Sequence, residues 1–140
     1  GARMHPDPLV VLVSALKADA GVLAVTDRVG TRTPPELSRA FARLTLLDER
    51  ASGPALHNVD ALVQIDCYGS ASETSAQAEA SELARAVRAA LFDLPSPTPV
   101  EGAIVSSVQN VGIARIPDST IDPPRERYLV TASVYLHPAP

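Results

Sequence analysis

Two carboxylates, a thiol and a phenol lie close together in the segment DALVQIDCYG, residues 60–69. Asp60 and Asp66 could act as a general acid and base on one bond only if their carboxyl groups lay roughly 5 to 9.5 Å apart. An extended strand rises about 3.3 Å per residue, so these two positions stand about 20 Å from each other. The pair therefore cannot share one reaction, and we interpret the segment as a strand.

The alternation of this strand predicts one fully apolar face and one mixed face. Cys67 is the single cysteine of the chain and falls on the apolar face. A lone cysteine excludes an intramolecular disulfide framework and a cysteine-built zinc site. We expect a buried structural thiol, because free cysteine behaves as a small hydrophobe. The residues of the apolar face are Val59, Ala61, Val63, Ile65 and Cys67.

Other catalytic motifs are missing from the sequence. His5, His57 and His137 lie in three separate segments without the spacing of metal ligands. No G-x-S-x-G, G-x-G-x-x-G or Walker sequence is present. We therefore expect no enzymatic activity, no cofactor and no bound metal. The alternative from a different class is a small ligand-binding or enzymatic α+β domain with a pocket between helices and sheet.

A second group of charged residues is crowded around prolines in IARIPDSTIDPPRER, residues 113–127. One interpretation is a solvated surface turn. The other is a contact between subunits, because arginine pairs with carboxylates directionally and sets register. The candidate interface residues in this segment are Arg115, Asp118, Arg125 and Arg127, with Asp122 and Glu126 beside them.

The first element that must position these residues is a helix over about 8–20. Asp7 is its expected N-cap, Pro8 its first helical residue, and Gly21 lies just past its expected end. Val10 and Val11 widen the apolar stripe beyond one helix face. We therefore expect cover from a second side, and both valines are candidate interface residues.

The remaining elements follow from apolar periodicity and turn residues. An exposed loop, long enough to be functional or mobile, is expected over 48–58. A long helix is expected after Gly69, with a Thr74–Gln77 capping box and an end before Pro95. The expected strands are 28–32, 41–47, the segment analysed above, 100–112 and 127–137, with a turn at Pro34-Pro35.

Length and composition are those of one domain. We interpret residues 1–6 as an N-terminal extension that includes a tag remnant, and 7–140 as a single domain. The net charge of −4 and the lack of a basic run argue against nucleic-acid binding. No apolar run approaches the roughly 20 residues that span a bilayer, so we expect a soluble protein from a reducing compartment. The fold class expected is α+β: a mostly antiparallel sheet of four to five strands with two helices packed on one face.

Three features together resemble the tail-terminator, or head-to-tail joining, family of long-tailed bacteriophages. They are the broad-faced N-terminal helix, the strand VDALVQIDCYG leading into the helix ELARAVRAALFDL, and the final pair of strands with IARIPDSTIDPPRERYLVTASVYL. The resemblance covers about 7–137 and is most specific at residues 65–69, in the helix after them, and at Arg127. Residues 22–50 depart from the pattern.

The resemblance implies a structural virion protein without enzymatic activity. Such a subunit assembles as a six-fold ring on the completed tail tube, ends tube polymerisation and offers a surface to the head connector. Its partners would be further copies of itself, the tube protein and a head-closure or connector protein. Genomic DNA would pass through the lumen without specific binding, and acidic charge suits such a passage. Assembly would take place in the bacterial cytoplasm, with the virion neck as final location. The alternative within the class is another head-tail connector component, such as a head-closure or adaptor ring.

Overall fold

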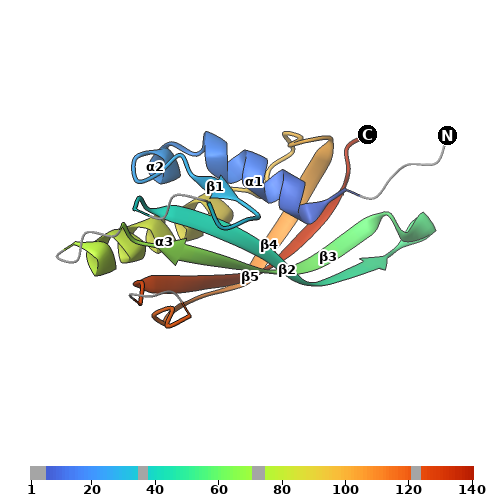
Figure 1. The fold of residues 1–140 in the computed structure, drawn as a ribbon. Helices are drawn as coiled ribbons and strands as arrows, with labels where there is room; N and C mark the ends of the chain where they lie inside the picture. Colours follow the sequence, from blue (N-terminus) through green and yellow to red (C-terminus); the bar gives the residue numbers. More distant parts are fainter. Residues whose placement is uncertain (1–5, 35–37, 71–74, 121–123) are drawn as a thin grey trace.

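The computed structural model describes residues 6–34, 38–70, 75–120 and 124–140. These residues form an α+β fold with one five-stranded, mostly antiparallel sheet, and the expected fold class is confirmed (Figure 1). The elements are α1 (Pro8–Ala18), α2 (Ala20–Leu23), β1 (Val29–Gly30), β2 (Phe41–Ser52), the 3-10 turn η1 (Pro54–Leu56), β3 (Asn58–Tyr68), α3 (Ala76–Phe92), β4 (Ala103–Arg115) and β5 (Arg127–Pro138).

The strand order is β1-β2-β3-β5-β4, so the final strand inserts between β3 and β4. β2 with β3, β3 with β5, and β5 with β4 pair antiparallel. β1 pairs parallel to β2 through Val29 opposite Ala42 and Gly30 opposite Arg43. The sheet edge at β1 is therefore only two residues long, and most of β2 has no neighbour on that side among the described strands.

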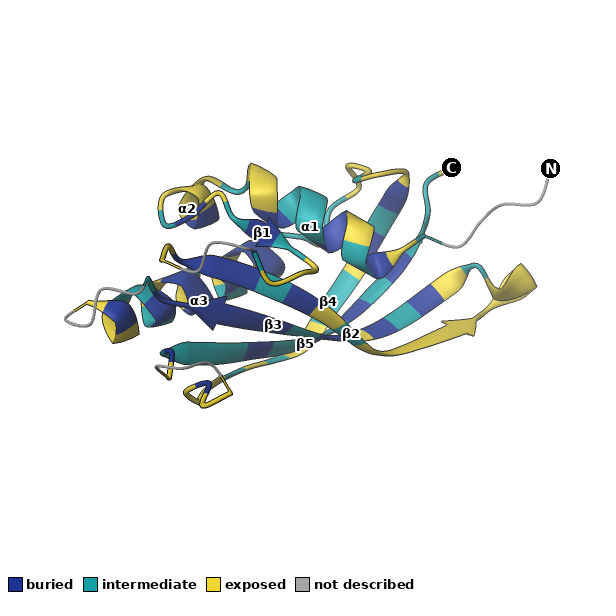
Figure 2. Cartoon of the chain, in the orientation of Figure 1, coloured by how far each residue is buried: buried dark blue, intermediate teal, exposed yellow. Residues whose placement is uncertain are grey.

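The core lies between the helices and one face of the sheet. Alternation along β3 places Val59, Ala61, Val63 and Ile65 in this core, as the sequence predicts. Cys67 joins them with no exposed surface, which confirms the expected buried thiol. Figure 2 shows the alternation of buried and partly exposed positions along the strands. Leucines and valines of α1 and α3 fill the helix side, among them Leu12, Leu16, Leu83, Val87 and Leu91.

The first helix begins as expected and ends earlier. Asp7 caps it, accepting hydrogen bonds from the amides of Leu9 and Val10. α1 stops at Ala18 because Asp19 turns the chain and caps α2 through the Val22 amide, so the expected continuation to residue 20 is wrong. Gly21 consequently lies inside α2 and does not end a helix.

Val10 and Val11, both candidate interface residues, lie in different environments. Val11 is 1% exposed and belongs to the core of its own subunit, so its assignment to an interface is wrong. α1 contacts α2 as well as the sheet, so part of the expected second-side cover comes from its own subunit. Val10 is 50% exposed, and its role in an interface stays a prediction.

The third helix is joined to β3 by a tight approach at Gly69. A Cβ atom at this position would stand 2.0 Å from the Ala76 carbonyl oxygen, so only glycine fits there. α3 spans Ala76–Phe92, close to the expected range, with Ser75 as N-cap. Thr74, the first member of the expected capping box, lies outside the described residues, as does Pro35 of the expected Pro34-Pro35 turn.

The expected loop over 48–58 is wrong, because most of it belongs to a long hairpin. β2 continues to Ser52 and β3 begins at Asn58, so the two strands are joined by five residues. We name residues 47–57 the arm. Every residue from 47 to 56 is exposed, and the arm projects beyond the rest of the sheet (Figures 1 and 2). None of the described helices is long and apolar enough to span a bilayer.

Candidate functional site

A cluster of polar side chains surrounds the hydroxyl of Tyr68. We name Arg43, Asp66, Tyr68, Asp118 and Arg127 the polar cluster. Arg43 Nη2 donates to Asp66 Oδ2 at 2.6 Å and to the Tyr68 hydroxyl at 3.3 Å. The Tyr68 hydroxyl donates to Asp118 Oδ2 at 2.6 Å, and Arg127 Nη1 lies 3.8 Å from the same oxygen. The cluster thus alternates positive and negative groups around one phenol.

Sheet register brings the strand members of the cluster together. Arg43 on β2 faces Asp66 on β3, and Tyr68 on β3 faces Arg127 on β5. Phe41 is the cross-strand partner of Tyr68 on the other side, and the two rings stack with centroids 4.4 Å apart. Such cross-strand pairs are the units that stabilise a sheet. The phenol is therefore fixed in place by three adjacent strands.

Asp118 enters the cluster from the connection between β4 and β5. Its backbone pairs with that of Arg125 through hydrogen bonds of 2.8 and 3.1 Å. Thr120 donates its amide to Asp118 Oδ1 at 3.0 Å, and its hydroxyl binds the same oxygen. The Arg125 guanidinium donates to the carbonyl of Gly69. The connection is therefore attached to the junction between β3 and α3.

Two members of the cluster, Asp118 and Tyr68, have shifted pKa values. Burial by itself would raise the pKa of Asp118, but hydrogen bonds from Thr120 and Tyr68, with the nearby Arg127 charge, lower that pKa to about 2. Burial, and then the hydrogen bond to Asp118, raise the pKa of Tyr68. A general acid or base works best with a pKa near the operating pH. Asp118 and Tyr68 do not meet this requirement, and their contacts are those of a structural network.

Two candidate interface residues are buried inside the subunit. Asp118 is 5% exposed and Arg125 is 7% exposed, so the expectation that they lie on the surface of an interface loop is wrong. The physical reason is the return of the connection onto β3: the Tyr68 hydroxyl donates to Asp118, and the Gly69 carbonyl accepts from Arg125. Asp122, from the same segment, lies outside the described residues.

Arg115 and Arg127 keep part of their side chains at the surface. Arg115 makes a two-pronged contact with Glu126, with Nε and Nη2 both donating at 3.0 to 3.2 Å. Arg127 donates to the Ile116 carbonyl at 2.9 Å. For Arg115, as for Val10, contact with a neighbouring subunit stays a prediction. Arg127 is mainly engaged within its own chain.

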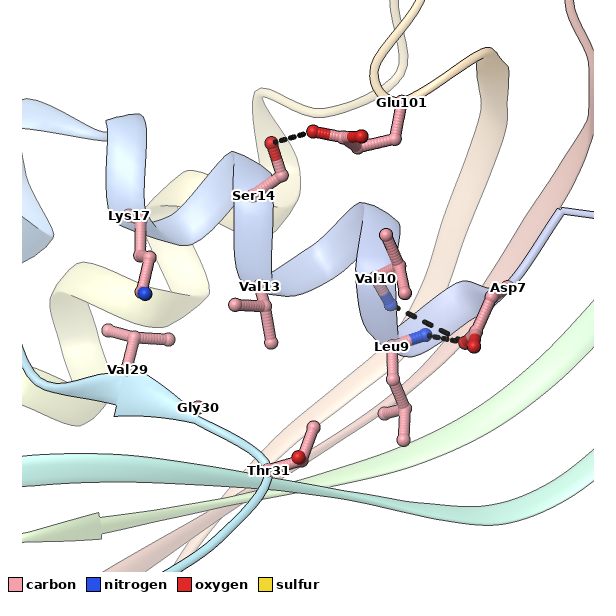
Figure 3. Close-up of a pocket in the computed structure, with 10 residues that line it drawn as sticks. All are labelled: Asp7, Leu9, Val10, Val13, Ser14, Lys17, Val29, Gly30, Thr31 and Glu101. Carbon is pink, nitrogen blue, oxygen red and sulfur yellow. Dashed lines mark hydrogen bonds between the residues drawn. The ribbon is translucent and has the colours of Figure 1, made fainter. Parts of the chain in front are cut away.

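An open groove lies between α1 and β1 (Figure 3). Its volume is about 670 Å³, and the surface of its walls is more apolar than polar. Figure 3 shows Leu9, Val13 and Lys17 directed from α1 toward β1, while Glu101 binds the Ser14 hydroxyl on another side of the helix. No described carboxylate lies within ion-pair distance of Lys17. The lining residues are Asp7, Leu9, Val10, Val13, Ser14, Lys17, Val29, Gly30, Thr31 and Glu101.

Sequence reasoning missed Arg43 and the groove. The position of Arg43 could have been inferred from the sequence. It lies between Ala42 and Leu44, whose side chains are buried, so alternation along the strand places Arg43 on the other face, together with Asp66. Lys17 and Glu101 come from distant segments, and no spacing in the sequence brings them together. Among the described residues no group of three or more His, Cys, Asp or Glu could hold a metal ion. Searches against protein-family models and against curated proteins find no match to this chain.

Proposed function

We propose that the chain is the ring-forming subunit of a phage tail terminator, a structural protein that caps the tail tube and ends its growth. The observation that carries the proposal is the arm. It extends the β2–β3 hairpin away from the body with every residue from 47 to 56 exposed, including Leu47 at 49% and Leu56 at 54%. Exposed apolar side chains on a projecting element are available for burial against a partner in assembly.

The polar cluster supports a structural role for the rest of the molecule. Arg43, Asp66, Tyr68 and Asp118 use their hydrogen-bonding groups on one another, and none of these contacts leaves a nucleophile beside a base. A network of this kind fixes the position of elements. It gives the subunit a rigid body from which the arm projects. The resemblance at residues 65–69 concerns this same junction.

The closest alternative is another ring of the head-tail connector, such as a head-closure or adaptor ring, which would use the arm in the same way. The groove favours a different class, a small ligand-binding or enzymatic domain. Its volume of about 670 Å³ is within the range of small-molecule sites, and Lys17 supplies a charged group in an aliphatic surround. Electron microscopy separates the alternatives.

The experiment uses tail tubes grown from the tube protein of the same phage. Purified protein is added during growth, and tube lengths and ends are recorded by electron microscopy. The proposal expects growth to stop and one end of each tube to carry a ring. A head-connector ring would bind capped tails but would leave tube growth unchanged. Tubes that grow to the same lengths and carry no added density would contradict the proposal.

A further inference from the structure

The end of the arm presents an apolar surface held in an uncommon backbone conformation. Pro54, Ala55 and Leu56 form η1, in which no residue is buried. Ala55 has φ 54° and Leu56 has φ 55°, both in the left-handed region that non-glycine residues seldom adopt. Two such residues in succession are energetically unfavourable for side chains other than glycine. This conformation holds Leu56 54% exposed at the end of the hairpin.

The groove between α1 and β1 has aliphatic side chains that could pack against the apolar end of the arm. Leu9, Val13 and Val29 line it, and Val10 at its margin is 50% exposed (Figure 3). A volume of about 670 Å³ is large enough for several side chains. Burying a leucine side chain removes apolar surface from water and so favours association. The apolar end of the arm and the groove would each cover the other's exposed aliphatic groups.

The charges of the two surfaces are complementary. The groove carries Lys17, which has no carboxylate within ion-pair distance in the described part of the chain, and Glu101 at its margin. The arm carries Glu49, which is exposed, and Arg50, whose side chain is 78% exposed. Opposite charges across an interface guide encounter and fix register. Glu49 can meet Lys17 when the arm of one copy lies in the groove of the next.

The arm cannot fill the groove of its own chain. Figure 1 shows the arm projecting along the strand direction at the end of β2 and β3 that is far from β1. The end of the arm and the groove therefore lie apart on one subunit. A contact between two different surfaces is head-to-tail, and it repeats from copy to copy until a ring closes. We propose that the arm of one subunit binds in the α1–β1 groove of the next copy. This inference rests on the proposed ring function and names the contact that builds the ring.

The test is disulfide cross-linking on assembled rings. Cys67 does not interfere, because it is fully buried and burial raises the pKa of its thiol. L56C and V10C variants are mixed in equal amounts on tail tubes and oxidised. The expected product is an L56C–V10C heterodimer, with the double variant in one chain giving a ladder of multimers. The control pair is L56C with A114C, an exposed position on β4, which should give little product.

Charge exchange provides a second measurement on the same contact. Lys17→Glu or Glu49→Lys alone should weaken assembly by about tenfold, since each brings like charges together. The two substitutions combined should restore assembly to within about threefold of the parent, because the pair is then reversed and not broken. Restoration requires that the two residues meet, so failure of the combined variant to recover would overturn the contact.

The outcomes separate this inference from the proposed function. Rings that form on tubes without the L56C–V10C product would overturn the contact and leave the capping function in place. A cross-link from V10C to the tube protein would show that the tube occupies the groove and would also overturn it. L56C–V10C multimers formed in solution by a protein that does not bind tubes would support the contact and contradict the capping function.

Discussion

The two ends of the β2–β3 hairpin carry the same kinds of charged side chain in opposite environments. At the base, Arg43 pairs with Asp66 at 2.6 Å, and their side chains are 28% and 2% exposed. On the arm, Arg50 pairs with Asp48 at 3.0 Å, and their side chains are 78% and 52% exposed. Breaking a buried pair leaves an uncompensated charge, whereas an exposed pair contributes little to stability. The base therefore stabilises the fold, whereas the ion pair of the arm contributes little to it.

The largest expected effect is at Asp118. Asp118→Ala should lower the free energy of unfolding by about 2 to 4 kcal/mol, because Tyr68 and Arg127 lose a buried charged partner. Asp48→Ala on the arm is the matched control and should change it by less than about 0.5 kcal/mol. Urea denaturation measures both. An equal decrease in the free energy of unfolding for the two variants would contradict the proposed difference between base and arm.

A second substitution tests the steric fit, and not the charges, at the junction between β3 and α3. Gly69→Ala should cost about 2 kcal/mol, because the new Cβ meets the Ala76 carbonyl and the backbone must shift. Gly30→Ala is the control, since nothing lies within 4 Å of its added Cβ, and we expect a change below about 0.5 kcal/mol. A melt of Gly69→Ala that matches the parent would show that β3 and α3 are not closely joined.

The pH dependence of stability gives a smaller effect from the same cluster. The pKa of Asp118 is about 2 in the folded protein against 3.8 for an ordinary aspartate, so the charged form is favoured by folding. Its contribution is fully present above about pH 4 and is lost as pH falls toward 2. Thermal melts of the parent and Asp118→Asn should therefore converge over this range. A difference that stays constant from pH 6 to pH 2.5 would contradict the assigned contacts.

The smallest expected effect on stability is on the arm. Leu56→Ser should leave the free energy of unfolding within about 0.5 kcal/mol of the parent, because the side chain is exposed. The same substitution should weaken assembly, since the contact loses an apolar group that becomes buried. Sedimentation of the variant with tail tubes checks the second part. Undiminished binding would show that Leu56 is an ordinary surface residue.

The sequence predicts the regular elements where one face is consistently apolar. β3 and β5 alternate over most of their length, and α3 keeps its apolar spacing, so their bounds were close. β2 was expected to end at residue 47 because a bulge between Leu46 and Asp48 interrupts the alternation and charged residues follow. The periodic signal disappears there although the hairpin continues.

The sequence does not predict which charges are buried. Asp118 is separated from Tyr68 by fifty residues, and its burial depends on β5 inserting beside β3. The same mixed charges could belong to a solvated turn. The groove is likewise assembled from residues of α1, β1 and the segment before β4, and no local spacing indicates it. The burial of Asp118 and the formation of the groove both depend on contacts between segments that are far apart in the sequence.

The most direct test of the role of the arm is to replace its end without disturbing its strands. Residues 53–57 are exchanged for Asn-Gly, a two-residue turn that suits antiparallel hairpins and keeps Ser52 opposite Asn58. Tube capping is then measured by electron microscopy beside a thermal melt. We expect an unchanged or slightly higher melting temperature with capping lost. A variant that caps tubes as well as the parent would contradict it.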